Sequence, residues 1–418
     1  MRLADTPEEA AFRAEVREFL RKELPDSQRA RDRGELLGGE LAGGGEEASG
    51  RLEARPGGAG FQRLSGDAAA WRQKLFERGW IAPGWPKEYG GGGLSIREQF
   101  ILNEESAEAG APQIAGMGIN IVGPILIRRG TEEQKLDHLP KILRGDEVWC
   151  QGYSEPGAGS DLASLQTSAV RDGDDFIING QKIWTSGAQA SNWMFLLART
   201  DPEAPKHRGI TFFLLDFTTP GITVQPLVNM AEIHGFNQVF FDSVRVPAKN
   251  VVGEVNRGWY VGLEALDFER SGIAGYVGLR QGLEGLIEFA RENVEEGRST
   301  LPRNPALRYE LVDRYIEAEV AKMLSYRIVY LQSIGQMPNY EASMAKLFQT
   351  ELSKRIYATA MKVIGLYGLS WDRESIYSPR RAQYARAYVQ SIGATLAGGT
   401  SEIQRNVIAQ RGLGMPRA

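Results

Sequence analysis

A turn rich in small residues offers backbone N–H groups and hydroxyls that could bind a ligand. Residues 149–161 read WCQGYSEPGAGSD. The run starts with β-prone side chains and breaks at Pro156 and Gly157, because proline fixes one backbone angle and glycine permits conformations that other residues resist. Ser154 and Ser160 add hydroxyls without bulk. The segment suits close approach of the backbone to a flat or phosphorylated ligand. The alternative is an ordinary Pro-Gly loop between strands.

A large aromatic residue beside two hydroxyls forms a second group that could bind a ligand. Residues 181–187 read QKIWTSG, so Trp184 precedes Thr185 and Ser186 at the end of a predicted strand. Together the two runs resemble the acyl-CoA dehydrogenase family, in which an EPGxGSD-like run and a WxTSG-like run line the isoalloxazine ring of FAD. The resemblance covers nearly the whole chain, from Thr6 to Arg417.

The resemblance implies cofactor and substrate contacts at matching positions. The residues that it implies at the FAD are Gln151, Tyr153, Ser154, Gly159, Ser160, Trp184, Thr185, Ser186, Gly365, Gly368, Thr400 and Glu402. Those that it implies at the acyl-CoA are Ser160, Asp267, Arg270, Gly398 and Gly399. A backbone N–H of one of the last two glycines would bind the thioester oxygen. The alternatives are that Trp184 is plain β-domain core and that Arg270 is a simple surface charge.

The catalytic base is the position at which this chain departs from many relatives. Dehydrogenation between the α and β carbons of a thioester needs a base, donors for the developing enolate and a hydride acceptor. Many family members carry the base in a Tyr-Glu-Gly-Thr run, but residues 397–400 read AGGT here. Residues 266–270 read LDFER and match an LDxER-like run of the isovaleryl and long-chain branches. The resemblance therefore assigns the base to Glu269. The alternative is a solvated glutamate paired with Arg270.

Two FAD-binding elements of the family are incomplete in this chain. Residues 291–297 read RENVEEG, without the arginine and phenylalanine of an RxxFG-like run. Residues 362–368 read KVIGLYG, which lacks the glutamine and one glycine of a QxxGGxG-like run. We therefore expect a homotetramer or a mixed tetramer whose subunits share FAD sites. The expected electron acceptor is an electron-transfer flavoprotein. The alternatives are an oxidase that uses oxygen, and a non-catalytic subunit that completes the site of another chain.

Composition narrows the possible partners. The chain has 418 residues, 42% hydrophobic, with a net charge of −4 and no basic stretch interleaved with aromatic residues, so we expect no nucleic-acid partner. A single cysteine, Cys150, cannot form a disulfide within the chain, which favours a cytoplasmic protein. Three scattered histidines predict no metal site. The most apolar segment, residues 114–127, is shorter than the ~20 residues that span a bilayer, so we expect no membrane partner.

Three capping boxes mark the predicted helices of the first part of the chain. They begin at Thr6, Ser95 and Thr131, and the helix from Thr131 is expected to end near Pro140. From residue 147 to 250, short alternating apolar runs replace the helical period.

The middle part predicts strands joined by tight turns. Asp172-Gly173 and Asn179-Gly180 are turn dipeptides between these runs. The helical period returns at Gly258 and persists to Arg411, which indicates a bundle. The fold class expected is α+β and acyl-CoA dehydrogenase-like. It comprises an N-terminal helical domain (1–146, with a flexible insertion at 31–66), a middle antiparallel β-barrel domain (147–256) and a C-terminal helical bundle (257–418).

Overall fold

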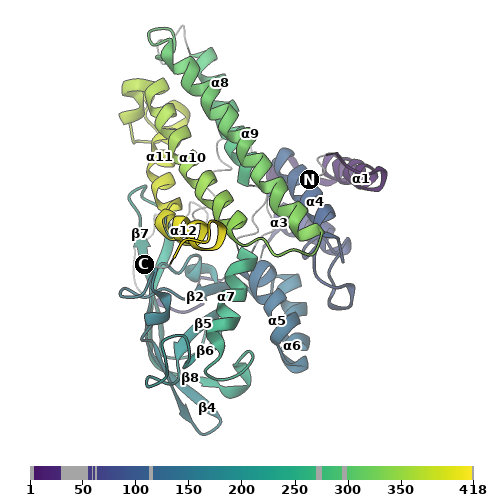
Figure 1. Ribbon diagram of the computed structural model, residues 1–418, viewed down its shortest axis with the longest axis vertical. Coiled ribbons are helices and arrows are strands. Elements are labelled where there is room, and N and C mark those ends of the chain that lie inside the picture. Colours follow the sequence, from purple (N-terminus) through teal and green to yellow (C-terminus); the bar gives the residue numbers. More distant parts are fainter. Residues whose placement is uncertain are drawn as a thin grey trace. The chain divides into compact units, whose positions relative to one another are not determined.

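The computed structural model describes residues 4–29, 55–58, 60–61, 64–112, 116–269, 275–293 and 299–416, without the side chains of residues 55 and 266–269. The described elements form two compact units, which we treat separately (Figure 1). The predicted insertion at 31–66 lies largely outside the described residues. Within it, Arg55–Pro56 forms strand β1 and pairs with β7 (Ile222–Val228).

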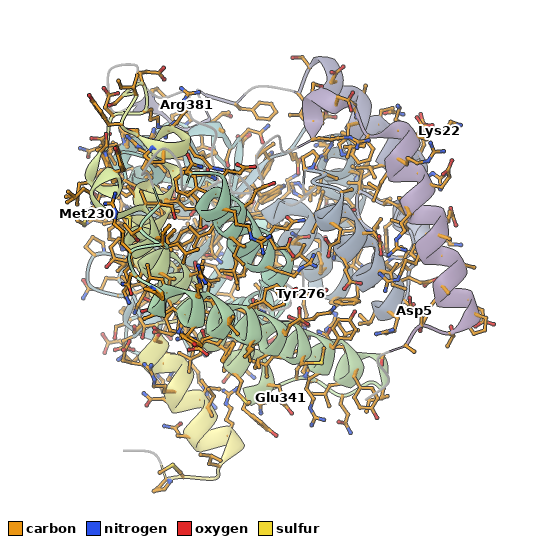
Figure 2. All side chains as sticks on the ribbon, turned by 90° about the horizontal axis from the view of Figure 1, so that it is seen from above. Asp5, Lys22, Met230, Tyr276, Glu341 and Arg381 are labelled. Carbon is orange, nitrogen blue, oxygen red and sulfur yellow. The ribbon has the colours of Figure 1, made fainter. Side chains whose placement is uncertain are left out.

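Helices make up the first unit (Figure 1). They are α1 (Pro7–Glu23), α4 (Ile96–Glu108), α8 (Gly275–Glu292), α9 (Ala306–Ser333), α10 (Tyr340–Ile364), α11 (Gln383–Ala394) and α12 (Ser401–Val407), with short helical turns η1 (Asp26–Gln28), η7 (Gly365–Leu369), η8 (Pro379–Ala382) and η9 (Ile408–Gly412). In Figure 2, α1 runs from near Asp5 to Lys22, and Tyr276 lies at the start of α8.

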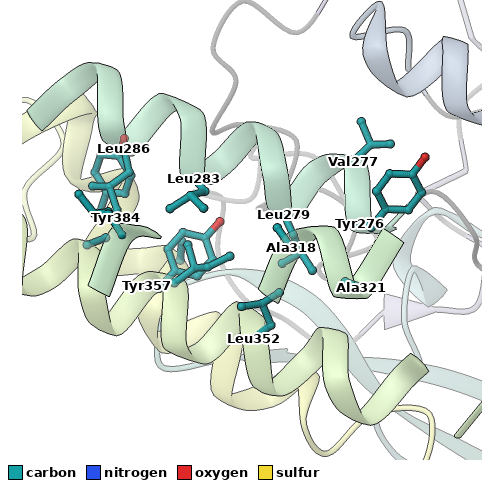
Figure 3. Packing of buried hydrophobic residues seen from close by; sticks show 14 of the residues in the cluster. Tyr276, Val277, Leu279, Leu283, Leu286, Ala318, Ala321, Leu352, Tyr357 and Tyr384 are labelled. Carbon is teal, nitrogen blue, oxygen red and sulfur yellow. The ribbon is translucent and has the colours of Figure 1, made fainter. Parts of the chain in front are cut away.

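Apolar side chains of α8, α9 and α10 form the core of this unit (Figure 3). Leu283 of α8 and Leu352 of α10 are fully buried, and Ala318 and Ala321 of α9 are small enough to allow close helix packing. Burying a leucine side chain fully contributes about 1.5–3 kcal/mol. The bundle is therefore held by interdigitated apolar faces, as the helical period after Gly258 predicts.

The three predicted capping boxes are present. The side chains of Thr6, Ser95 and Thr131 each accept a hydrogen bond from the third helical N–H, and Glu9, Glu98 and Gln134 bond back to the cap N–H groups. These reciprocal bonds satisfy backbone donors that the first turn would leave unpaired.

The predicted end of the third helix was wrong. Helix α6 (Glu132–Arg144) continues through Pro140 and ends at Gly145 in a left-handed conformation. Proline removes the hydrogen bond to the carbonyl of Leu136, but Leu136 is exposed, so water can solvate that oxygen. Burial of Ile142 and Leu143 beyond the proline favours continuation of the helix.

The second unit combines helices with a sheet. The helices are α3 (Gly66–Glu77), α5 (Gly123–Arg129), α6 and α7 (Gly258–Glu269), and short helical turns are η2 (Lys87–Tyr89), η3 (Gly118–Val122), η4 (Leu162–Ser164), η5 (Ala188–Ala190) and η6 (Ala248–Asn250). The remaining strands are β2 (Trp149–Gly152), β3 (Ser168–Asp172), β4 (Asp175–Lys182), β5 (Trp193–Arg199), β6 (Ile210–Asp216) and β8 (His234–Pro247). The sheet order is β1-β7-β8-β4-β3-β5-β2, with β6 also pairing with β5.

Two details of the sheet differ from the sequence prediction. Strand β5 pairs in parallel with β2 and with the start of β3, whereas the other pairings are antiparallel. Asn179-Gly180 is not a turn: it lies inside β4 at a register shift, with Gly180 at φ 140°. A Cβ at Gly180 would lie 2.8 Å from the Thr167 backbone, so the glycine permits a close backbone approach, opposite the point where β8 has one extra residue. Asp172-Gly173 does form the predicted β3–β4 turn.

Candidate active site

The loop after β2 carries the first group of predicted ligand-binding residues. Tyr153 is buried, and its hydroxyl donates to the carbonyl of Gly262 at 3.5 Å. Glu155 and Ala158 exchange backbone hydrogen bonds, which closes the turn around Pro156 and Gly157. Gly159 and Ser160 follow at the exposed side of this turn. Hydrogen bonds therefore fix the turn from Tyr153 to Ala158, whereas Gly159 and Ser160 are exposed.

The end of β4 carries the second group. The Ile183 N–H donates to the Ser154 carbonyl at 2.8 Å, so the two predicted motifs lie side by side. Trp184 adopts a left-handed φ of 58° and is 60% exposed. Such a backbone conformation is costly for a bulky residue and is concentrated at functional sites.

Two polar atoms within these motifs are buried and have no hydrogen-bond partner in the part of the chain that the structure describes. The Thr185 N–H donates to the Asn237 carbonyl at 3.0 Å, but its hydroxyl oxygen has no hydrogen-bond partner among the described residues. Nε2 of Gln151 likewise has no hydrogen-bond partner among the residues that the structure describes. Ser186 is half-buried in the same turn. Buried polar atoms normally have a partner, so these atoms are suited to a polar ligand.

A second cluster of predicted residues belongs to the helical unit. Thr400 caps α12 by accepting from the Ile403 N–H at 3.2 Å, so its hydroxyl already has one partner. Lys346 and Gln404 donate to the Gly399 carbonyl at 2.8 and 3.2 Å. A Cβ added at Gly398 would meet no atom within 4 Å, so this glycine faces open space.

Other predicted residues of this unit lie near the same helices. Glu402 is exposed, and local hydrogen bonds, including one with Thr400, hold its pKa below the ordinary value. Gly365, at φ 64°, ends α10, and Gly368 is buried in the turn that follows. Sequence reasoning did not identify Lys346 or Gln404, which fix the turn before α12.

The predicted base lies at the limit of the described structure. Helix α7 ends at Glu269, but the side chains of Asp267 and Glu269 lie outside the described residues, as does Arg270. Their assigned roles therefore stay predictions.

A buried lysine and glutamate also join the two motifs, and sequence reasoning missed their role. Lys182 is fully buried, and its Nζ donates to Oε1 of Glu155 at 2.8 Å. Burial would raise the Glu155 pKa, but Lys182 and the neighbouring donors outweigh it and hold the pKa below its ordinary value. The signal in the sequence was a lysine at an inward position of a strand, after buried Phe176 and Ile178.

Two other groups in the second unit have plain structural interpretations. Cys150 is buried, and desolvation raises its pKa to about 12, so it is a poor nucleophile. Asp137, His138 and Glu147 lie close enough together to hold a metal ion. However, Lys141 donates to Asp137 at 2.6 Å, and Nδ1 of His138 contacts Glu147 at 3.0 Å. We interpret this cluster as an ion-pair network.

Comparison with known proteins identifies the class of this chain. Family models for the N-terminal, middle and C-terminal domains of acyl-CoA dehydrogenases match residues 59–146, 150–244 and 256–413. The chain belongs to the acyl-CoA dehydrogenase family and has its fold. It is thus an oxidoreductase that acts on a CH–CH bond of acyl-CoA. Among the residues that the structure describes, no helix is long and apolar enough to cross a bilayer.

Bacterial members of the family are similar over most of the chain. The acyl-CoA dehydrogenase IpdE1 of Mycobacterium tuberculosis is 38% identical over 351 residues, covering 83% of this chain and 88% of the relative. A solved structure titled Tcur3481-Tcur3483 steroid ACAD has 34% identity and a TM-score of 0.78, with 100% of both chains covered. The ChsE4-ChsE5 complex from M. tuberculosis gives the same identity, TM-score and coverage.

Proposed function

We propose that this chain is an FAD-dependent dehydrogenase that converts an acyl-CoA thioester to the trans-2-enoyl-CoA. The observation that carries the proposal is the hydrogen bond from Ile183 to Ser154, which joins the two motifs at one site. FAD bound there would supply the acceptor for a hydride.

The residues at this site fit a flat ring with polar edges. The exposed ring of Trp184 offers an aromatic surface. Oγ1 of Thr185 and Nε2 of Gln151, which have no hydrogen-bond partner among the described residues, could make polar contacts with the ligand. A Cβ at Gly157 or Gly159 would meet no atom within 4 Å, which leaves the turn open to a ligand. The flanking Ser154, Ser160 and Ser186 would add hydroxyl or backbone contacts.

The proposed reaction breaks two C–H bonds and forms one C=C bond. Glu269 takes the proton from the α carbon, and the bonding electrons become the new double bond. The β hydrogen leaves as a hydride, with the electron pair of its C–H bond, and bound FAD would accept it. Backbone N–H groups of Gly398 and Gly399 would stabilise charge at the thioester oxygen. Asp267 and Arg270 would bind the CoA portion, together with Ser160.

The family resemblance also assigns FAD contacts to residues of the helical unit. Thr400 and Glu402 would contact the pyrophosphate and adenosine portions of FAD. The backbone at Gly365 and Gly368 would contact the FAD of a neighbouring subunit. Because residues 362–368 lack part of the family's run, we propose that an intact site needs a second chain.

The exposed face of α9 supports assembly with another chain. Tyr309, Val312, Ile316, Val320 and Met323 recur at helical spacing and are all exposed. A cavity of about 490 Å³ borders Val312 and Ile316, and another of about 380 Å³ borders Val320 and Met323. Contiguous apolar surface of this kind is typical of protein interfaces. We propose a homotetramer or a heterotetramer with a chain of the same fold.

The purified chain tests the proposed function directly. We expect a yellow protein whose flavin absorbance bleaches on anaerobic addition of an acyl-CoA. A panel of straight, branched and steroid-bearing thioesters would define the substrate, since one similar solved structure is described as a steroid ACAD. A protein that holds flavin but is bleached by none of them would contradict the proposal.

Partner chains and electron acceptors need separate assays. A colourless chain that becomes yellow only with a second family member would support the shared site, and one that stays colourless would support a non-catalytic role. Reoxidation by an electron-transfer flavoprotein is the expected route, whereas stoichiometric peroxide from oxygen would favour an oxidase. Ile316→Glu should lower the assembled mass in light scattering. An unchanged mass would exclude the α9 face as the interface.

A further inference from the structure

We infer that the buried ion pair of Lys182 and Glu155 is a positioning element of the cofactor site. It clamps the turn after β2 to the end of β4 and thereby fixes the backbone that presents Trp184. This inference rests on the proposed function for the identity of the ligand, but the clamp itself concerns only residues of this chain.

The pair joins separate segments of the second unit. Nζ of Lys182 donates to Oε1 of Glu155 at 2.8 Å and to the carbonyl of Tyr153 at 2.9 Å. The carboxylate of Glu155 also accepts the N–H groups of Gln166 and Thr167 at 2.7 and 2.9 Å. The ammonium therefore contacts two points of the β2 turn, and the carboxylate ties that turn to the segment before β3.

The cost of burying these charges argues for more than packing. Lys182 is 0% exposed and Glu155 8% exposed. Burying an ion pair is expensive, and an apolar pair of similar volume is often equally or more stable. What the charged pair provides is a directed contact with the Tyr153 carbonyl and a defined separation between two loops. We therefore assign it an orienting role.

The clamp acts on the proposed flavin contacts through the backbone. The Ile183 N–H, directly after Lys182, donates to the Ser154 carbonyl, and Trp184 follows in its left-handed conformation. A strained residue holds its conformation only where its surroundings over-determine it. Loss of the clamp should release both the β2 turn and the Trp184 turn, while distant strands stay paired.

Hydrogen exchange of the cofactor-free protein tests the clamp. Lys182→Met keeps much of the side-chain volume and removes the charge. We expect amide exchange in residues 153–160 and 183–187 to rise about tenfold or more, while β5 and β6 keep their protection. Val244→Ala, a core truncation on β8, is the control for general destabilisation. Equal exchange in these loops for Lys182→Met and Val244→Ala would overturn the inference, as would no local change.

Flavin affinity provides the second readout. In the same variants the FAD dissociation constant should rise about tenfold for Lys182→Met and stay near the wild-type value for Val244→Ala, a difference of about 1.4 kcal/mol. If Lys182→Met does not fold, Glu155→Gln provides the same test, because the amide fills the space without the charge. A folded variant with wild-type affinity and loop exchange would refute the clamp. Failure of the wild type to bind FAD, both alone and with a second family member, would refute the proposed function, while the exchange data would still decide the clamp.

Discussion

Lys182 is fully buried against Glu155, with 2.8 Å between its ammonium and the carboxylate. Desolvation lowers the pKa of Lys182 to about 8, and attraction to Glu155 offsets this only in part. In the unfolded chain the lysine pKa returns to the ordinary value of 10.5. Between these pH values the unfolded chain therefore binds more protons at this site than the folded chain does.

The first prediction follows from this difference in proton binding. The contribution of Lys182 to the free energy of unfolding should increase as the pH rises from about 8 to 10.5, because stability increases with pH wherever the unfolded state binds more protons. Below about pH 8 the contribution should be constant. Urea unfolding of wild type and Lys182→Met across this range isolates the group, because other titrations are common to both. Parallel pH profiles for the two proteins would contradict the assignment.

The second prediction concerns the strained backbone at Trp184. Trp184→Gly should change the free energy of unfolding by less than about 1 kcal/mol, because relief of strain offsets the greater entropy of glycine in the unfolded chain. FAD affinity should nevertheless fall about tenfold, since the aromatic surface is lost. Ser243→Gly is a matched control, because Ser243 has a similar φ of 52° on β8. Chemical unfolding and flavin titration provide both readouts, and unchanged affinity in Trp184→Gly would argue against a flavin contact.

The third prediction tests a buried carboxylate in the helical unit. Oε1 of Glu104 accepts the Tyr326 hydroxyl at 3.0 Å, and Arg13 donates to Oε2 at 2.6 Å. Tyr326→Phe should lower the free energy of unfolding by about 2 kcal/mol, because a hydrogen bond to a charged group is worth more than a neutral one. Tyr309→Phe serves as the control, since Tyr309 is 76% exposed and should change stability little. Equal urea midpoints for the two variants would disprove this role.

Local sequence signals predicted the helices well because their causes are local. The capping boxes at Thr6, Ser95 and Thr131 need only residues three apart, and all three are present. The same local reasoning failed at Pro140, where burial on the far side of the proline outweighs one missing hydrogen bond. It also failed at Asn179-Gly180, because pairing with β8 keeps this typical turn dipeptide inside β4, opposite an extra residue of β8.

The candidate site was predictable as two motifs but not as one structure. The runs at residues 149–161 and 181–187 stand out by composition, whereas their contact depends on how the sheet places β2 and β4, which β3 and β5 separate in the strand order, and that is a long-range property. From the sequence, Lys182 could be interpreted only as part of a run of alternating apolar residues, because no local pattern predicts its pairing with Glu155. The base and the CoA contacts rest on the resemblance, because the side chains of Asp267 and Glu269 and the whole of Arg270 lie outside the described residues.

Anaerobic reduction of the flavin in Glu269→Gln is the most direct test of the account. The wild type should bleach on mixing with an acyl-CoA that it turns over. The variant should hold the same amount of FAD and bleach at least ~10³-fold more slowly, since removing a general base typically costs about 10²–10⁴-fold and glutamine cannot accept the α proton. Bleaching at the wild-type rate would show that another residue is the base and would contradict the account.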